Sequence, residues 1–426
     1  MSVPVASAVL EASTPPAPPM SLRRYMTLVG WGLLVTTLGQ TQSIGILPLR
    51  FLLKRHLHTS PTAMAAFLSV ILLPWTFKPL AGLLADGVPL FGTRRRAYLL
   101  SSCAVGGLCW LAMGSMPRSY LPLLWTGVAL NVSMVFASTV TGGVLVEGAQ
   151  AHGATGRLSS LRLVVINIAY IVSGPAGGFL AAHWFGWTAL TGAILLFSMV
   201  PMTWFLLREP PLPARTEQTA SALRGIWHQI RTVFPAKTLW MAGGLLFLIQ
   251  VAPGLYTPLF YHQTNNLKFS EQFIGNLQVL YGGMGLLGSF VYPLFCRRVR
   301  LRWLLVFAVA CTAMSNLAYL GYVSRNTAMV IEGAAGLGIT LAQLPLFDLA
   351  ARATPKGSEA LAYSLIIAIW NVGLSLSDLI GSYLFDEFKL TFQNLVWVNA
   401  GTTILVIFAV PFLPSRLIDR KEGESV

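Results

Sequence analysis

A single lysine lies between two prolines in an otherwise apolar segment of the chain. Lys78 follows Pro74 and Trp75 and directly precedes Pro79 in the stretch PWTFKP. Because proline donates no backbone hydrogen bond, the two prolines are expected to leave the carbonyls of Val70 and Trp75 without their helical partners. Freed backbone in apolar surroundings is tolerated where it is buried in protein or lines a water-filled cavity. Lys78 and Trp75 could therefore form a site for an anionic or aromatic solute, through charge, cation–π contact or stacking.

Five further polar side chains in apolar segments are candidates for contact with a solute or a proton. Asp378 and Glu332 are the candidates for a proton-coupling group, since a carboxyl group in apolar surroundings can take up a proton near neutral pH. Asn371 lies seven residues before Asp378 and therefore on the same face of a helix. Asn131 and Gln278 are candidates for substrate contact, and each is equally suited to hydrogen bonding between helices.

A second group of charges follows Lys78. Asp86 comes four residues after Gly82 and precedes the arginine run 94–96. This pattern resembles the loop after the second helix of major facilitator transporters, whose carboxylate and arginines bridge neighbouring helices on the cytoplasmic side. The alternative is that the arginines only set the orientation of the chain in a membrane. With charges from the next loop on the same side, the predicted cytoplasmic gate comprises Gly82, Asp86, Arg94, Arg95, Glu147 and Arg157.

The composition identifies the setting of these residues. Hydrophobic residues make up 55% of the 426 positions and charged residues 10%, whereas an average soluble domain is about a quarter charged. Apolar runs of about 20 residues, the length that crosses a bilayer, recur along the chain. We predict an all-α membrane protein with twelve transmembrane helices at 25–48, 61–85, 97–115, 119–145, 159–182, 184–207, 236–261, 270–296, 303–322, 326–350, 358–384 and 391–414.

The net charge of +14 would suggest nucleic acid as the partner of a soluble protein. Here most of the 29 lysines and arginines fall on the side of the membrane that holds both termini. The positive-inside rule then predicts a multi-pass protein of the cell (inner or plasma) membrane with both termini in the cytoplasm, surrounded by membrane lipids and without a nucleic-acid partner. This setting offers Lys78 an alternative role, because it can extend to the headgroups or pair with a carboxylate.

A polar stretch divides six predicted helices from six, which is the organisation of major facilitator transporters. We find no motif for a nucleophile and base, a phosphate loop or a metal cluster in the sequence, so we predict no enzyme, no cofactor and no metal, and transport driven by a gradient. The predicted segments are a disordered cytoplasmic leader 1–22, an N-terminal half 23–207, a cytoplasmic linker 208–235, a C-terminal half 236–414 and a cytoplasmic tail 415–426.

Three groups of residues resemble the folate-biopterin transporter family, a branch of the major facilitator superfamily, and the resemblance spans roughly residues 45–385. The first group, which is similar to that family's second helix and following loop, comprises Pro74, Trp75, Lys78, Pro79, Gly82, Asp86, Phe91, Gly92, Arg94, Arg95, Arg96 and Tyr98. The other two groups, which are similar to its tenth and eleventh helices and to its loop after the fourth helix, are 349–359 with Asn371, Gly373 and Gly381, and 146–160.

The resemblance implies a secondary transporter that moves folates or pterins by alternating access, commonly in symport with protons. Trp75 suits the flat pterin ring of such a substrate, and Lys78 suits the anionic glutamate tail of a folate. The chain departs from the family at Ser138 and Gly142, where members carry two aspartates four residues apart. The alternatives are a facilitator for another amphiphilic solute, such as a peptidoglycan fragment or a drug, and a membrane sensor or scaffold that does not transport.

Overall fold

The computed structural model describes residues 20–88, 90–93, 95–152, 154–209, 231–292, 294, 298–355 and 359–419. Helices joined by turns and loops make up this part of the chain, with one isolated bridge between Leu90 and Thr93. Most of the predicted leader and of the linker, and the last seven residues of the tail, lie outside these residues. Ten helical segments of the described part are long and apolar enough to cross a membrane. Because lipid cannot satisfy backbone polar groups, such helices are the expected solution.

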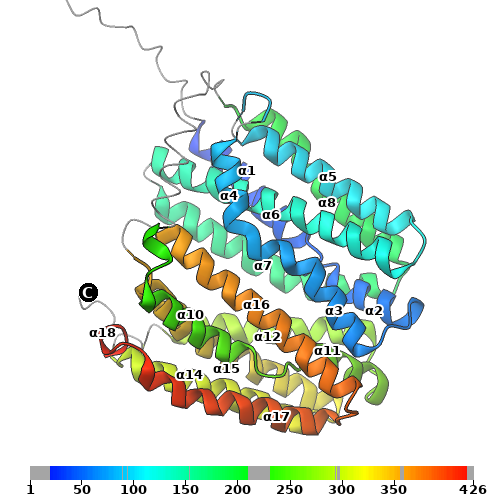
Figure 1. Cartoon of the computed structure of the whole chain (residues 1–426). Helices are drawn as coiled ribbons and strands as arrows, with labels where there is room; N and C mark the ends of the chain where they lie inside the picture. Colours follow the sequence, from blue (N-terminus) through cyan, green and yellow to red (C-terminus); the bar gives the residue numbers. More distant parts are fainter. Residues whose placement is uncertain are drawn as a thin grey trace, which may run out of the picture.

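The helices form two groups along the chain (Figure 1). The first group consists of α1 (Leu22–Leu38), α2 (Ile46–His56), α3 (Pro61–Leu72), the 3₁₀ helix η1 (Leu73–Phe77), α4 (Lys78–Gly87), α5 (Arg96–Ser115), α6 (Tyr120–Ala151), α7 (Thr155–Ala181) and α8 (Phe185–Leu206). The second group consists of α10 (Lys237–Gln250), α11 (Tyr256–Tyr261), the π-helical turn η2 (His262–Asn266), α12 (Glu271–Val291), α14 (Leu301–Leu317), η3 (Ala318–Gly321), α15 (Arg325–Arg352), α16 (Glu359–Asp386), α17 (Phe392–Leu405), η4 (Val406–Phe412) and α18 (Ser415–Ile418).

The first and seventh predicted spans are interrupted helices. The segment 39–45 separates α1 from α2, and the segment 251–255 separates α10 from α11. Both interruptions fall in the opening helix of their half, as expected for an internal repeat. The predicted end of the first span at residue 48 was wrong, because α2 continues to His56 and places Arg50 and Lys54 within a helix. The charges that ended the apolar run find partners in the other half of the molecule.

The helix that carries Lys78 changes geometry where the prolines predicted a break. It runs as α3, tightens into η1 and continues as α4 from Lys78. The expectation that two carbonyls lose their partners was wrong: Leu73 N–H donates to the Val70 carbonyl and Lys78 N–H to the Trp75 carbonyl. The 3₁₀ turn thus replaces the hydrogen bonds that the prolines remove.

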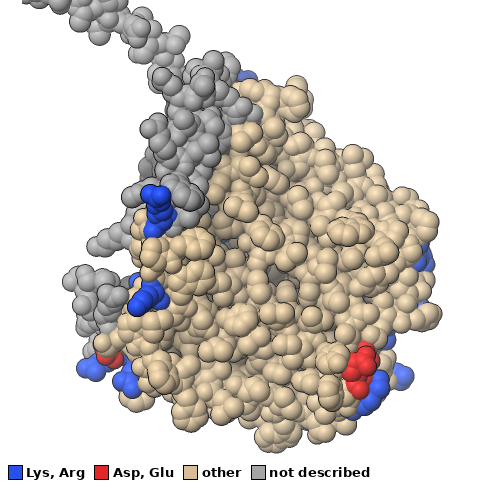
Figure 2. Space-filling model, viewed as in Figure 1, with Lys and Arg blue, Asp and Glu red and all other residues tan. Residues whose placement is uncertain are grey.

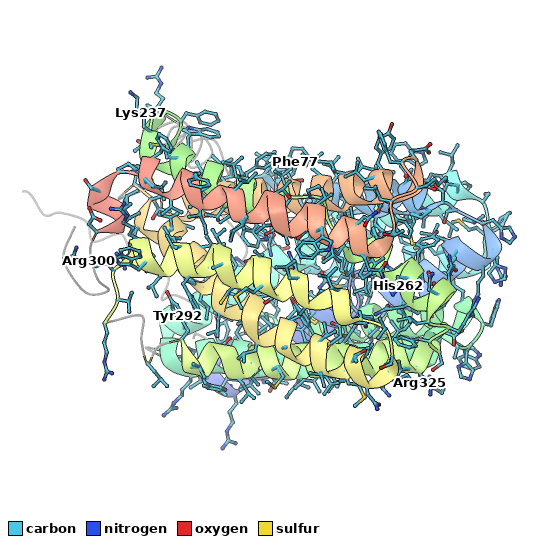
Figure 3. All side chains as sticks on the ribbon, turned by 90° about the horizontal axis from the view of Figure 1, so that it is seen from below. Phe77, Lys237, His262, Tyr292, Arg300 and Arg325 are labelled. Carbon is cyan, nitrogen blue, oxygen red and sulfur yellow. The ribbon has the colours of Figure 1, made fainter. Side chains whose placement is uncertain are left out.

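Charged side chains gather at the two ends of the helices. On the face shown in Figure 2, Lys, Arg, Asp and Glu lie at opposite ends and leave an uncharged band between them. Seen from below, Lys237 and Arg300 lie at one end and His262 and Arg325 at the other (Figure 3). We call the first the termini side, because Leu22 and Ser415 begin the first and last helices there, and the second the far side. The uncharged band suits the hydrocarbon core of a membrane.

The two halves meet at the far side and separate toward the termini side. α16 packs closely along α3 and η1 and much less along α4. At the far end of α7, Gly174 and Gly178 lie directly against the backbone of α12, so the glycines there serve close packing. The hydrogen bonds and ion pairs that join two described residues across the halves lie from the level of Ser69 outward. They are Lys54 with Thr264 and Asn265, Arg55 with Glu271, Thr59 with Tyr261, Thr62 with Ser382 and Asp386, Ser69 with Ser375, and Pro175 with Gln272.

The closest backbone approach at the seventh-helix interruption gives a test of this packing. A Cβ at Gly381 of α16 would lie 1.9 Å from the Gly254 carbonyl oxygen, so Gly381→Ala should lower the free energy of unfolding by about 1–3 kcal/mol. A Cβ at Gly401 of α17 would meet no described atom within 4 Å, so Gly401→Ala should be neutral or slightly stabilising. Thermal unfolding of both variants in detergent makes the measurement, and equal unfolding temperatures would contradict the contact.

Candidate functional site

Lys78, Trp75 and Asn131 form one connected group. The Lys78 Nζ atom donates a hydrogen bond to Ser138 Oγ at 3.0 Å and lies 5.2 Å from the centre of the Trp75 ring. Trp75 Nε1 donates to Asn131 Oδ1 at 2.9 Å, and the Asn131 side chain is fully buried. Asn131 Nδ2 in turn donates to Thr41 Oγ1 at 3.0 Å, in the interruption of the first helix. Three of the predicted binding residues therefore lie together between η1, α4 and α6.

The 3₁₀ turn explains why Lys78 and Trp75 share a face. With about three residues per turn, side chains three positions apart eclipse one another. The ammonium group thus lies near the indole ring of the residue three positions before it, within the roughly 6 Å range of a cation–π contact. This group lies at the junction of η1, which packs against α16, and α4, which has little contact with α16. Lys78 is therefore held at the point where the halves separate.

The charges around Lys78 are positive. Among the described residues, Lys78 forms no ion pair, and its hydrogen-bond partner is the neutral Ser138. The charged residue that acts on Lys78 is Arg162 of α7, another cation, whose side chain is exposed. Two cations without a neighbouring carboxylate attract an anion. The alternative that Lys78 pairs with a carboxylate finds no support in the described part of the chain.

Gln278 and Asn371 lie apart from this group. Gln278 of α12 is half buried against Gly174 of α7, where a Cβ on the glycine would approach its side chain. Its place is thus the contact between helices of the two halves. Asn371 of α16 is half buried one turn from Ser375, whose carbonyl accepts from Ser69 Oγ at 3.3 Å, so Asn371 is level with the start of η1. Asn371 therefore lies at a depth close to that of Trp75, which is part of η1.

Asp378 lies where the two halves meet. Its Oδ1 atom accepts from the Thr257 backbone N–H and its Oδ2 atom from Thr257 Oγ1, both at 2.7 Å. Thr257 follows the interruption of the seventh helix. The charge of Arg50, from α2 of the other half, reaches this carboxylate. Asp378 is thus a carboxylate with both oxygens hydrogen-bonded within its own half, and a cation of the other half acts on it.

Glu332 lies within the second half, near the far side. Glu332 is 8% exposed, and its carboxylate accepts from the hydroxyl groups of Tyr322 at 3.0 Å and Tyr319 at 3.4 Å. The amide of Gln263 donates to the same Tyr322 hydroxyl at 2.7 Å. This chain of hydrogen bonds links α15 to η2 and η3. Glu332 and Asp378 therefore belong to separate networks.

Three residues of the predicted gate, Arg95, Glu147 and Gly82, have contacts that the structure describes. Arg95 is buried and its Nη2 atom lies 2.8 Å from Glu147 Oε1, while the backbone N–H groups of Arg95 and Arg96 donate to the Glu209 carboxylate at 3.0–3.2 Å. Gly82 faces Thr139 of α6, which allows α4 to pack there. These contacts join parts of the first half to one another.

The other gate residues add nothing to that network as described. Arg157 is exposed on α7. Asp86 lies on α4, but its side chain is outside the described part of the structure, as is the whole of Arg94.

Three residues near these networks were missed from the sequence: Arg50, Glu209 and the role of Ser138 as the partner of Lys78. Arg50 had a signal, because apolar residues continue on both sides of it in ILPLRFLL. Glu209 had none, since its contacts are with backbone 114 positions away. For a metal, the described residues contain no group of three or more His, Cys, Asp or Glu side chains that could hold an ion.

Solved structures with a similar fold are transporters. The nucleoside transporter NupG superposes with a TM-score of 0.72 over 92% of this chain and 99% of its own, at 12% identity. A D-xylose-proton symporter superposes with a TM-score of 0.68 over 95% of this chain and 100% of its own, also at 12% identity. The chain therefore has the fold of major facilitator transporters, with many helices long and apolar enough to cross a membrane.

The particular family follows from the sequence. Residues 39–425 match the BT1 family, and the chain belongs to that family. It is 29% identical to a folate-biopterin transporter from Synechocystis sp. over 389 residues, which is 86% of this chain and 77% of the relative. It is 25% identical to a probable folate-biopterin transporter 4 from Arabidopsis thaliana, covering 78% of this chain and 82% of the relative. The resemblance read from the second helix is thereby confirmed.

The buried link between Trp75 and Asn131 can be tested by a double-mutant cycle. Asn131→Leu leaves the Trp75 N–H and the Thr41 hydroxyl unpaired, which should cost about 1–3 kcal/mol of unfolding free energy. Trp75→Phe removes the indole donor. The double variant should therefore lose less unfolding free energy than the sum of the losses in the two single variants. Chemical denaturation of the four proteins gives the coupling energy, and additive effects would show that the hydrogen bond contributes nothing.

Proposed function

We propose that this protein is a secondary active transporter that moves a pterin- or folate-like organic anion by alternating access, in symport with protons. The single observation that carries the proposal is Lys78: a cation inside a membrane-spanning segment, held over an indole ring, without a carboxylate partner among the described residues. A charge at this depth is costly and usually functional. Relatives named as folate-biopterin transporters support the choice of substrate.

The ring and the anion of such a substrate match different parts of this group. Trp75 offers an aromatic face on which a flat pterin can stack, and the ammonium of Lys78 offers a counter-charge. In this proposal Asn131 orients Trp75 through its hydrogen bond and does not contact the substrate, whereas Asn371 lies at the right depth to do so. Gln278 is assigned to packing between the halves.

Alternating access is supported by the way the halves separate. The hydrogen bonds and ion pairs between described residues of the two halves lie toward the far side, and α16 has little contact with α4 toward the termini side. With both termini in the cytoplasm of a cell membrane, as the charge distribution predicts, this is the inward-facing state. The network of Arg95, Glu147 and Glu209 is then the gate on the cytoplasmic side, and it meets the second half when that side closes.

Proton coupling is assigned to Asp378 first and to Glu332 second. Asp378 lies at the interface between the halves and near Arg50, so its protonation changes an attraction that crosses the interface. Glu332 is buried with tyrosine donors inside one half, where its protonation acts less directly on the movement of the halves. This order follows the general rule that intramembrane carboxylates mark proton pathways.

Uptake of radiolabelled folic acid into proteoliposomes tests the function. An inward-directed proton gradient should accelerate uptake several-fold, and Asp378→Asn should lose this stimulation while still binding folic acid. Glu332→Gln is the matched variant and should retain part of the stimulation. An uptake rate that does not depend on the proton gradient would contradict proton symport. Saturable binding of folic acid without its transport would favour a sensor.

Lys78→Ala should abolish folic acid transport while the protein still inserts and folds, because the anion loses its counter-charge. Lys78→Arg is the companion variant: it keeps a positive charge at this position and should retain part of the transport. Ser138→Ala keeps the charge free and should bind within about threefold of the unmodified protein. Unchanged uptake kinetics in Lys78→Ala would remove Lys78 from the site.

A further inference from the structure

Arg50 is a buried cation whose hydrogen-bonding edge is unused. Its side chain is 5% exposed, and its Nε and Nη2 atoms make no hydrogen bond with any residue that the structure describes. The guanidinium carbon lies 3.7 Å from the centre of the Tyr256 ring and 5.4 Å from that of Phe260. Arg50 comes from α2 of the first half, and both rings come from α11 of the second. Stacking thus fixes the plane of the guanidinium across the interface between the halves.

The same pair of nitrogens binds a carboxylate elsewhere in this protein. Arg352 donates from Nε to Asp348 Oδ1 at 3.0 Å and from Nη2 to Asp348 Oδ2 at 2.8 Å. This side-on arrangement, with two parallel hydrogen bonds, is the preferred way in which arginine holds a carboxylate. Arg50 presents the same edge without an acceptor. A buried donor without a partner is unfavourable, so the edge is complete only when a ligand or a movement supplies two oxygens.

The carboxylate of Asp378 is already engaged. Both of its oxygens accept hydrogen bonds from Thr257 at 2.7 Å, and neither accepts from the Nε or Nη2 atom of Arg50. Tyr256 itself is 54% exposed and lies between the halves, since Arg50 of the other half covers one of its faces. A molecule between the halves therefore has access to this region when α11 moves away from α2.

The depth of Arg50 relative to Lys78 suits a long substrate. Ser69 is level with Ser375, so Asp378, three residues further out on α16, is level with residue 66 of α3. Lys78 then lies twelve residues deeper, about 18 Å at 1.5 Å per residue. Arg50 covers the ring of Tyr256, and the next residue, Thr257, donates both hydrogen bonds to Asp378, so Arg50 belongs to the outer level. Two cations, one near each end of this interval, can hold two ends of one elongated anion.

We propose that the Nε–Nη2 edge of Arg50 binds a carboxylate of the transported substrate, in a second subsite that is uncovered as the halves open at the far side. Tyr256 holds the guanidinium plane in place, and Lys78 and Trp75 hold the rest of the molecule. This inference rests on the proposed function for its substrate, an organic anion with a ring at one end and a carboxylate at the other. It assigns Arg50 a role in selecting carboxylates over neutral pterins.

Binding to purified protein, measured by thermal stabilisation and titration, tests the subsite. The probes are folic acid, which carries a glutamate tail, and biopterin, which has the same ring system without a carboxylate. Arg50→Lys keeps the charge but loses the two-donor edge, and it should weaken folic acid binding at least tenfold while changing biopterin binding less than twofold. Arg50→Gln should do the same. Arg55→Gln, on the same helix but paired with Glu271 at the far surface, is the control and should change neither.

The outcomes separate this inference from the proposed function. Equal losses for folic acid and biopterin in Arg50→Lys would mean that Arg50 only holds the halves together, and no loss for either would remove it from the site. If the unmodified protein binds neither probe, the proposed substrate class is wrong, and p-aminobenzoylglutamate, benzoate and succinate become the probes. A carboxylate whose binding Arg50→Lys weakens tenfold would then still uphold the subsite, and binding of none would overturn both proposals.

Discussion

The backbone of a membrane-spanning segment has no water to bond with, and this constraint accounts for where the helices of this protein break. Each break is satisfied from neighbouring helices. In the first helix, the Gly39 carbonyl accepts from Trp110 Nε1 at 2.7 Å. In the seventh, the Ala252 carbonyl accepts from Ser377 Oγ at 2.5 Å and the Pro253 carbonyl from Asn399 Nδ2 at 2.8 Å. Breaks are thus confined to the protein interior, where side chains can replace water.

The same constraint places the candidate site. A broken helix exposes polar backbone to the interior and brings polar side chains with it: Thr41 in the first break bonds Asn131, and Thr257 after the seventh-helix break bonds Asp378. The 3₁₀ segment before Lys78 is the third irregularity, and it packs against α16 and α6. All three lie on helices that meet between the halves. The polar interior of this transporter is therefore built around the places where its helices are not regular.

Prediction from sequence succeeded where the signal was local. The two prolines around Lys78 predicted an irregular helix, and the structure has one. The carbonyls that were expected to be free are satisfied by 3₁₀ hydrogen bonds. The other two breaks were not predicted, because Gly39 and the stretch VAPGL occur inside apolar windows that look continuous. Arg50 was assigned to a loop for the opposite reason: charge ended the apolar window, whereas aromatic rings of the other half cover that charge in the structure.

The sequence by itself determined the class, the two-half organisation and the family, because hydropathy and short motifs are properties of contiguous residues and need no knowledge of neighbours in space. Only the tertiary structure decided which polar groups are paired. Lys78 meets Ser138 from 60 positions away, Asn131 divides its amide between Trp75 and Thr41, and Arg50 stacks on a helix of the other half. Those pairings depend on how helices pack and on which state the halves adopt, and local sequence encodes neither.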